Sequence, residues 1–459
     1  MRDNLLNYTE QIEALARAFG LDYYPVDFEI VPPSFMMEVA VYGLPVRMPH
    51  WSFGVRFIYQ FVQHKMGHSK IFEVVFPGNP GHAYLANTNS LAENTLVTAH
   101  VLGHADFSKN NILFDQVQRQ VSDHIVEQAA SHAHHIEEAL ETYGQERVEV
   151  LLDCALALEQ HIDIDHPLIR PPLSKRPEIH VGHHADNPFL SRFDVLPGER
   201  HHEATPQKSQ KKTPAEPFPR HPEKDLLWFI AQYAPELDDW ERDIFLAVRR
   251  ESFYFYPVFA CQIMNEGWAS YWHAKLLREA DFLPQGLYVD AIKAHSDVVR
   301  PYAGEKQVAL ALNPYHLGFV MWEKIIEEKG LEAAFAIRAE EDDFGFIRNY
   351  LNTDLAKELD LFVYSRRRNG EVKILDQDVH SVHEAILAPK YNFSAPRISI
   401  SELRQDGTLV LRHDHGIDGR GLDLERTKRV LEYIHRIWKR PVKLYTLNAR
   451  GDEEILTAA

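Results

Sequence analysis

The pattern of apolar and polar positions predicts a mainly helical chain. Apolar side chains recur at helical spacing in residues 4–19, through most of residues 90–163, and again between residues 225 and 388. Residues 71–76 and 84–86 instead resemble two paired strands, with a turn rich in proline and glycine between them. We therefore expect helices to form most of the body of the protein.

The C-terminal end of the chain has a different pattern. Residues 397–403 alternate apolar and polar side chains as a strand does, and Asp406-Gly407 is a hairpin signal. The elements expected after it are a return strand at 408–413, a helix at 424–439 and strands at 442–446 and 454–457. This order predicts a small α+β domain with an antiparallel sheet.

These patterns divide the chain into four parts. Seven prolines lie among polar residues between positions 185 and 224, where few aliphatic side chains occur. The predicted parts are a mostly helical N-terminal part (1–184), a flexible proline-rich linker or excursion (185–224), a second helical part that completes the same body (225–390) and the antiparallel α+β domain (391–459).

Charge and composition exclude several classes of function. The net charge is −18, with 67 acidic and 49 basic residues, which argues against a nucleic-acid partner or an anionic membrane surface. Only two cysteines occur, no apolar stretch is long enough to span a membrane, and we recognise no signal peptide. We expect a cytoplasmic protein. With 26 histidines and so few cysteines, any transition-metal site would use His, Asp and Glu.

His100 and His104 are the first candidate metal ligands. They lie four residues apart on an apolar predicted helix, so both imidazoles face the same side and can reach one ion. The alternative is that both are hydrogen-bonded core histidines. Asp106 lies close enough to orient one of them, whereas Glu93 is better explained as the capping-box partner of Ser90.

Two further segments supply candidates. Glu266 lies among aromatic and aliphatic residues, where a carboxylate is costly to bury unless it is paired or binds a metal; a helix-surface carboxylate is the alternative. His273 shares its predicted helix face, and it contacts substrate, serves as a fourth ligand if the helices cross obliquely, or simply ends an aromatic patch. Tyr315 and His316 follow a predicted helix start and would stabilise a developing negative charge, or serve in capping and packing alone.

Four segments together resemble the signature of the stage V sporulation protein R (SpoVR) family. They are MPHWSFGVRF (48–57), AHVLGHADFSKNN (99–111), MNEGWASYWH (264–273) and NPYHLGFVMWEKI (313–325). The resemblance extends from about residue 5 to the C-terminus. It implies a role in spore cortex or peptidoglycan-related physiology, and association with a PrkA-type kinase and a von Willebrand-factor-like protein.

Two of these segments also resemble zinc peptidases of the gluzincin kind. That resemblance implies a zincin-like helical body in which His100, His104 and Glu266 hold zinc or another divalent transition metal. Val101 departs from it, because a general-base glutamate follows the first histidine in those enzymes.

Three functions follow as hypotheses. The first is a metal-dependent hydrolase in which Asp106, or Glu93 after a helix bend, takes the proton. In it His273, Tyr315 and His316 contact substrate or stabilise charge. The second is a non-catalytic regulatory protein with a structural or vestigial metal site. The third is a redox protein with a His/carboxylate iron site.

Overall fold

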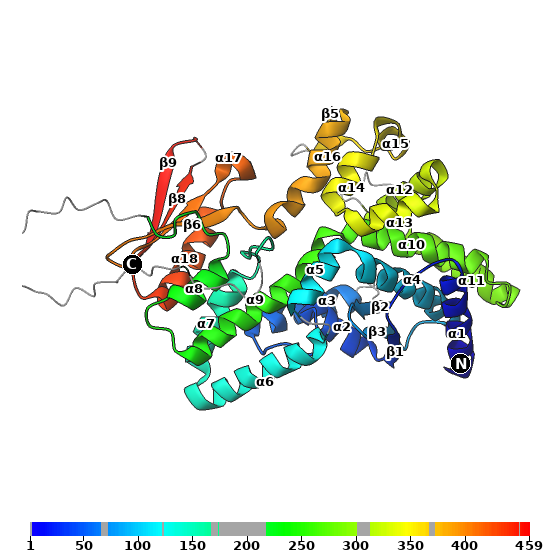
Figure 1. Cartoon of the computed structure of the whole chain (residues 1–459), viewed down its shortest axis with the longest axis horizontal. Coiled ribbons are helices and arrows are strands. Elements are labelled where there is room, and N and C mark those ends of the chain that lie inside the picture. Colours follow the sequence, from blue (N-terminus) through cyan, green and yellow to red (C-terminus); the bar gives the residue numbers. More distant parts are fainter. Residues whose placement is uncertain are drawn as a thin grey trace, which may run out of the picture. The chain divides into compact units, whose positions relative to one another are not determined.

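The structure is a computed structural model that describes residues 2–65, 72–121, 124–166, 173, 217–300, 313–366, 372–448 and 450–459. It is mainly helical, with a small sheet domain at the C-terminal end, as the sequence predicts (Figure 1). The chain forms two compact units. The first comprises Met1–Leu152, Ile164–Ile169 and Ala247–Ala395; the second comprises Asp153–Asp163, Arg170–Leu246 and Pro396–Ala459.

The secondary structure elements follow one another in this order. In the first half they are α1 (Arg2–Ala18), β1 (Val26–Val31), α2 (Pro33–Tyr42), α3 (Trp51–Lys65), β2 (Glu73–Phe76), β3 (Gly81–Ala86), α4 (Leu91–Asn110), α5 (Ile112–Val121), α6 (Ile125–Tyr143), α7 (Gln145–Ala157), α8 (Leu226–Tyr233) and α9 (Asp239–Ala260). In the second half they are α10 (Gln262–Arg278), α11 (Gln285–Val298), α12 (Pro314–Lys329), α13 (Leu331–Glu340), α14 (Asp343–Tyr350), α15 (Thr353–Glu358), β4 (Val363–Arg366), β5 (Val372–Asp376), α16 (Val379–Leu387), β6 (Ile398–Leu403), β7 (Leu409–His413), α17 (His415–Asp418), α18 (Leu424–Trp438), β8 (Val442–Leu447) and β9 (Glu453–Ala458).

A three-stranded sheet covers part of the first unit, with the strand order β1-β3-β2. β2 and β3 pair antiparallel, which confirms the two strands predicted from the sequence. β1 pairs parallel with β3 and was not predicted, and neither was the following helix α2. The strand at Glu73–Phe76 is short, yet it places Glu73 close to the candidate histidines.

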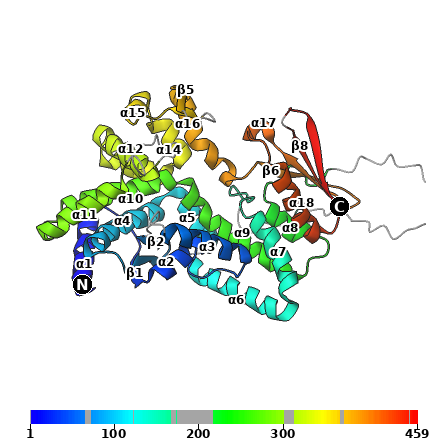
Figure 2. The ribbon, with the colours of Figure 1, turned by 180° about the vertical axis from the view of Figure 1, so that it is seen from behind.

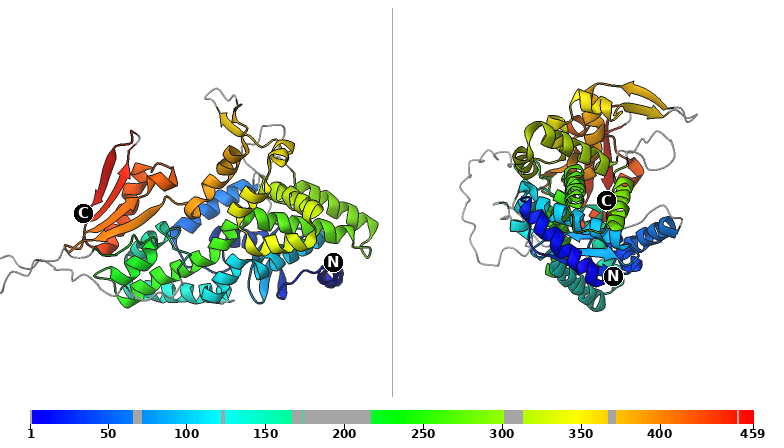
Figure 3. Two further views of the ribbon diagram at one scale, coloured as in Figure 1. Left: turned by 45° about the horizontal axis from the view of Figure 1, so that its top comes forward. Right: turned by 90° about the vertical axis from the view of Figure 1, so that its right-hand side faces the viewer.

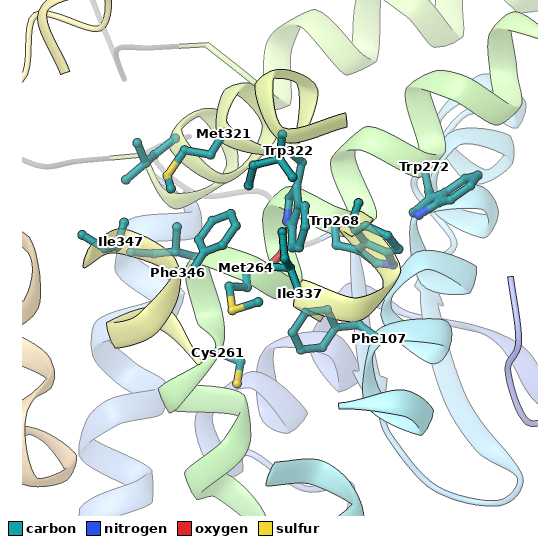
Figure 4. Close-up of a cluster of buried hydrophobic side chains, with 14 of the residues drawn as sticks. Phe107, Cys261, Met264, Trp268, Trp272, Met321, Trp322, Ile337, Phe346 and Ile347 are labelled. Carbon is teal, nitrogen blue, oxygen red and sulfur yellow. The ribbon is translucent and has the colours of Figure 1, made fainter. Parts of the chain in front are cut away.

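The first unit is built around α10, which lies between α4 and α12 (Figure 2). Its core contains Phe107 of α4 together with Trp268, Trp272 and Trp322, and the rings of Trp268 and Trp322 have centroids 4.8 Å apart (Figure 4). Residues from both predicted helical parts therefore share one core.

Small residues allow these three helices to approach unusually closely. A Cβ atom at Gly103 of α4 would lie 2.6 Å from Cα of Ala269 of α10, and one at Gly267 of α10 would lie 2.2 Å from the carbonyl carbon of Gly318 of α12. Real Cβ atoms essentially never approach other heavy atoms so closely. Backbone-to-backbone contact thus fixes the positions of α4, α10 and α12 relative to one another.

The second unit carries a four-stranded sheet in the order β6-β7-β8-β9 (Figure 3). The strands, the helix α18 and the hairpin between β6 and β7 confirm the predicted elements. The prediction of an antiparallel sheet is wrong at one pairing, because β7 and β8 are parallel. α18 connects these two strands, and a crossover helix returns the chain to run in the same direction.

The structure describes only the end of the predicted linker, together with the second helical part that follows it. Residues 185–216 lie outside the described residues. Residues 217–224, in contrast, pack against the C-terminal sheet: Glu223 forms an antiparallel bridge with Ile400 of β6, and the amide of Leu403 donates to the carbonyl of Phe218. Residues 225–246 also group with this sheet and not with the helical body.

The close approach of α10 and α12 leads to the first prediction. Gly267→Ala should lower the free energy of unfolding by about 3 kcal/mol, because the added methyl group would overlap the backbone at Gly318. The matched control is Gly54→Ala in α3, where nothing lies within 4 Å of the added atom. The control should be neutral or stabilising by up to about 1 kcal/mol. Denaturant unfolding measures both, and equal effects of the two substitutions would contradict the close packing.

Candidate functional site

α4 carries the two candidate histidines into the core of the first unit. Ser90 caps the helix and forms a reciprocal capping box with Glu93, which confirms the interpretation of Glu93 as a capping residue. Ten residues further along, the helix buries His100, which is 2% exposed, and then His104, which is 9% exposed. Both side chains face α10 across the close contact at Gly103.

Three donor atoms from α4 and α10 converge at one point. Nε2 of His100 lies 3.0 Å from Nε2 of His104. Oε2 of Glu266 lies 3.5 Å from the first nitrogen and 3.4 Å from the second. These three residues form a group whose donor atoms could hold a metal ion. The structure therefore brings together the three residues that the sequence nominated as ligands.

The nitrogen on the far side of His104 is held by a side-chain amide. Nδ1 of His104 lies 2.8 Å from Oδ1 of Asn265, and an amide oxygen can only accept a hydrogen bond. His104 therefore carries a proton on Nδ1, and in the neutral imidazole the lone pair of Nε2 points at His100 and Glu266. Asn265 was not predicted from the sequence as a site residue, although it stands directly before Glu266.

His100 is held by a chain of two further histidines. Its Nδ1 lies 2.9 Å from Nδ1 of His273, and Nε2 of His273 lies 2.6 Å from Nδ1 of His295 on α11. If each ring donates outward along this chain, Nε2 of His100 is left with its lone pair at the convergence point. If the chain donates inward, Nε2 of His100 carries a proton toward His104. One arrangement suits a bound cation and the other suits hydrogen-bonded core histidines.

Charge couples Glu266 to the two histidines. Burial by itself would raise the pKa of the Glu266 carboxyl, but His104 and His100 outweigh it and lower this pKa to about 2. Burial likewise lowers the pKa of His104, and the Glu266 carboxylate outweighs it, so that the pKa of His104 is raised. Glu266 is thus ionised at neutral pH and offers a negative charge to whatever lies between the histidines.

Glu73 and Tyr315 complete the surroundings of the cluster. Oε1 of Glu73 lies 3.9 Å from Nε2 of His100, and burial raises the pKa of the Glu73 carboxyl. The pKa of Tyr315 lies well above its ordinary value, mainly because of the negative charge of Glu266. Burial and the charge of Glu73 raise this pKa further. The rings of Tyr315 and His100 are stacked, with their centroids 6.1 Å apart. Glu73 was missed because nothing in a short strand signals which site it will face.

The helix that carries Tyr315 begins as predicted. Asn313 caps α12 with its side chain, and Pro314 occupies the first turn. His316 points elsewhere: its Nδ1 lies 3.1 Å from the carbonyl oxygen of Val299, and burial lowers its pKa. Of the two residues at this helix start, the structure brings Tyr315 to the cluster and gives His316 a backbone partner outside it.

Asp106 does not orient a histidine, contrary to the expectation from the sequence. Its carboxylate accepts hydrogen bonds from the amide of Asp22, the indole of Trp268 and the guanidinium of Arg338, at 2.8, 2.8 and 2.6 Å. It lies two residues beyond His104, which turns it to a different face of α4. This fully buried group is therefore committed to a salt bridge in the core and not to the cluster.

Val101 is also directed away from the cluster. It is fully buried in an apolar group that includes Ala83, Leu85 and Leu277. A glutamate at this position would place a carboxylate in hydrocarbon surroundings. The absence of a general base there is consequently built into the packing of α4 against the sheet.

Comparisons with known proteins cover nearly the whole chain. Residues 1–394 match the family described as SpoVR like protein, and residues 396–449 match the SpoVR-like C-terminal domain. The uncharacterized protein YcgB of Escherichia coli (strain K12) is 31% identical over an alignment that covers 98% of this chain and 93% of that protein. No solved structure matches, so likeness to the zincin fold is not shown. Among the described residues, no helix has the length and apolar character needed to cross a membrane. On the strength of these two family matches, the chain belongs to the SpoVR family.

Proposed function

We propose that His100, His104 and Glu266 bind a divalent transition-metal ion, and that this protein is a metal-dependent hydrolase. The observation that carries the proposal is the near-equilateral triangle of donor atoms, with sides of 3.0, 3.4 and 3.5 Å. Donor atoms about 2.0–2.2 Å from one ion at tetrahedral angles are about 3.3–3.6 Å apart, so two of the three sides fit zinc directly.

Hydrogen bonding alone accounts for this triangle less well. A proton on Nε2 of His100 would explain its distance of 3.0 Å from His104, but the distances from Oε2 of Glu266 to the histidines are too long for good hydrogen bonds. Oε2 is buried, and among the described residues it has no hydrogen-bond partner. A buried carboxylate oxygen needs a compensating charge, and a cation between the three atoms would supply it.

The residues around the triangle suit hydrolysis. A divalent metal ion held there would act as a Lewis acid that polarises a carbonyl group and promotes attack by water. Glu73, whose raised pKa favours proton uptake, is placed to act as the general base that position 101 does not provide. Tyr315 retains its proton and would donate a hydrogen bond to a developing oxyanion. His273 and Asn265 hold the two histidines in place.

The substrate class and partners follow from the family resemblance. We propose amide bonds of peptidoglycan-derived peptides as substrates, in physiology related to the spore cortex, and zincin-like use of the two helices. A PrkA-type kinase and a von Willebrand-factor-like protein are the proposed partners. Both cysteines, Cys154 and Cys261, are free and buried, which supports action in the reducing cytoplasm.

A regulatory protein with a structural metal site is the second candidate. The observation that favours it is the full burial of Val101, which removes the usual general base. The same burial makes Val101→Glu unsuitable for separating the two candidates, because the new carboxylate would disturb the core. Substitution of Glu73 separates them without that difficulty, since Glu73 is partly exposed and lies at the cluster.

The first test of the metal proposal is elemental analysis. Protein purified without chelators or added metals should contain about one equivalent of a transition metal per chain, and His104→Ala should lose it because one of three ligands is removed. The matched control is His134→Ala on α6, whose side chain is 68% exposed, and which should retain the metal. Zinc would support hydrolysis, and iron would support the redox alternative. Metal-free wild-type protein that also fails to bind added zinc would contradict the proposal.

The chain of histidines behind His100 generates a second prediction. His273→Leu should weaken zinc affinity by about 10–100-fold, because His100 loses the hydrogen bond that orients its ring. His316→Leu is the matched control: it also removes a histidine with an internal hydrogen bond, but one whose partner is the carbonyl of Val299. Competition with a coloured chelator measures both affinities. Equal losses would show that general damage to the fold, and not ring orientation, sets the affinity.

The third prediction separates the enzyme from the regulator. Glu73→Gln should leave metal content unchanged and lower kcat on peptidoglycan fragments by about 10²–10⁴-fold, because the amide cannot accept a proton from water. Elemental analysis and product detection by mass spectrometry give the two readouts. Turnover that survives Glu73→Gln would remove Glu73 from the mechanism. Metal-loaded wild-type protein without turnover on peptides or peptidoglycan fragments would favour the regulatory candidate.

A further inference from the structure

Helix α3 turns an apolar face outward from the first unit. Trp51, Val55, Ile58, Tyr59 and Val62 are 56%, 59%, 66%, 66% and 40% exposed. Their spacing places all five on one side of the helix, within a single broad stripe. Side chains of this size are individually common at protein surfaces, but a contiguous apolar stripe indicates an interaction site.

The opposite side of α3 anchors the helix. Phe53 is 1% exposed, and its ring packs edge-on against Tyr42 of α2 with centroids 5.0 Å apart. Arg47, which precedes the helix, lies near the ring of Phe53 and forms a buried salt bridge with Glu251 at 2.8 Å. One face of α3 therefore packs against the rest of the unit, and the exposed apolar stripe lies on the face that does not take part in this packing.

The charge around α3 has a sign opposite to that of the whole protein. Residues 39–72 contain no Asp or Glu, although the chain has 67 acidic residues among 459. The same stretch contains Arg47, Arg56, Lys65 and Lys70. Arg47 is used internally, whereas Arg56 is exposed beside the apolar stripe. An apolar stripe in a stretch with only positive charges is complementary to a surface that is both apolar and anionic.

We propose that α3 binds the surface of a membrane that contains anionic lipids, with its axis in the plane of the bilayer. The helix has 15 residues, too few to span the hydrocarbon core, but it has the aromatic and basic side chains typical of helices that lie at the interface. Trp51 and Tyr59 would lie at the level of the headgroups, where indole and phenol rings are favoured. Ile58 and Val55 would enter the acyl region.

The charge argues for lipid and against a second copy of this chain. Pairing of two α3 helices would bring Arg56 of one copy toward a second helix that has no acidic side chain to neutralise it. The net charge of −18 explains why composition alone argued against a membrane surface. The net charge of the whole chain conceals the positive charge of residues 39–72. Because salt screens distant charges, the nearby positive charges determine how α3 interacts with a surface in contact with it.

The test uses the full-length protein and co-sedimentation with vesicles. Wild-type protein should bind vesicles of phosphatidylcholine mixed with phosphatidylglycerol, bind vesicles of phosphatidylcholine alone much more weakly, and dissociate at high salt. Ile58→Glu should reduce binding by about tenfold or more, because a carboxylate would face the acyl region. The matched control is Ile417→Glu, since Ile417 is 64% exposed in the other unit. It should bind as wild type does.

Each other outcome overturns the proposal. These outcomes are absence of binding, equal binding to neutral and anionic vesicles, and equal binding of wild type and Ile58→Glu. A decrease in oligomer size for Ile58→Glu, seen by light scattering without vesicle binding, would assign α3 to contacts between copies. Circular dichroism should be unchanged in both variants, because both isoleucines are exposed, and it excludes misfolding as the cause of lost binding.

Discussion

The close packing of α10 against α4 and α12 is the constraint on which the rest of the first unit depends. Helix axes normally lie about 8–10 Å apart, and side chains set that spacing. At Gly103 and Gly267 no side chain intervenes, so the backbones themselves are in contact. His104 follows Gly103, and Glu266 precedes Gly267. The residues that permit the close approach are thus neighbours of the residues that the approach brings together.

Asp106 is a buried charged group of this unit whose partners are all defined. Asp106 is enclosed by Arg338, Trp268 and the amide of Asp22. Such a group stabilises one arrangement of the helices, because any shift would leave a charge without its partner. The Glu266 cluster differs from it: its central carboxylate oxygen is surrounded by histidine nitrogens that are too distant to bond well. A buried carboxylate oxygen that faces two histidine nitrogens at these distances resembles a site prepared for a ligand.

The sequence predicted those features that depend on local pattern. Histidines four residues apart on an apolar helix, a glutamate within an aromatic segment, and the hairpin at Asp406-Gly407 all depend on short-range spacing. Features that depend on the direction of packing were not predictable. Glu73 is one, since β2 shows no sign of the site that it borders. The direction of Asp106 and the parallel pairing of β7 with β8 are others, because both are set by how elements far apart in sequence come together.

Val101 shows how packing limits the chemistry available to α4. In a helix, the side chain next to a ligand points about 100° away from it around the helix axis. It therefore packs against a different part of the protein. Val101 packs against the apolar group that contains Ala83 and Leu277, and only a hydrocarbon side chain is compatible with those surroundings. A proton acceptor for water at the cluster must then come from another element. The sheet that buries Val101 also carries Glu73 to within 3.9 Å of His100. The packing that excludes a base from the helix therefore positions one on the adjoining strand.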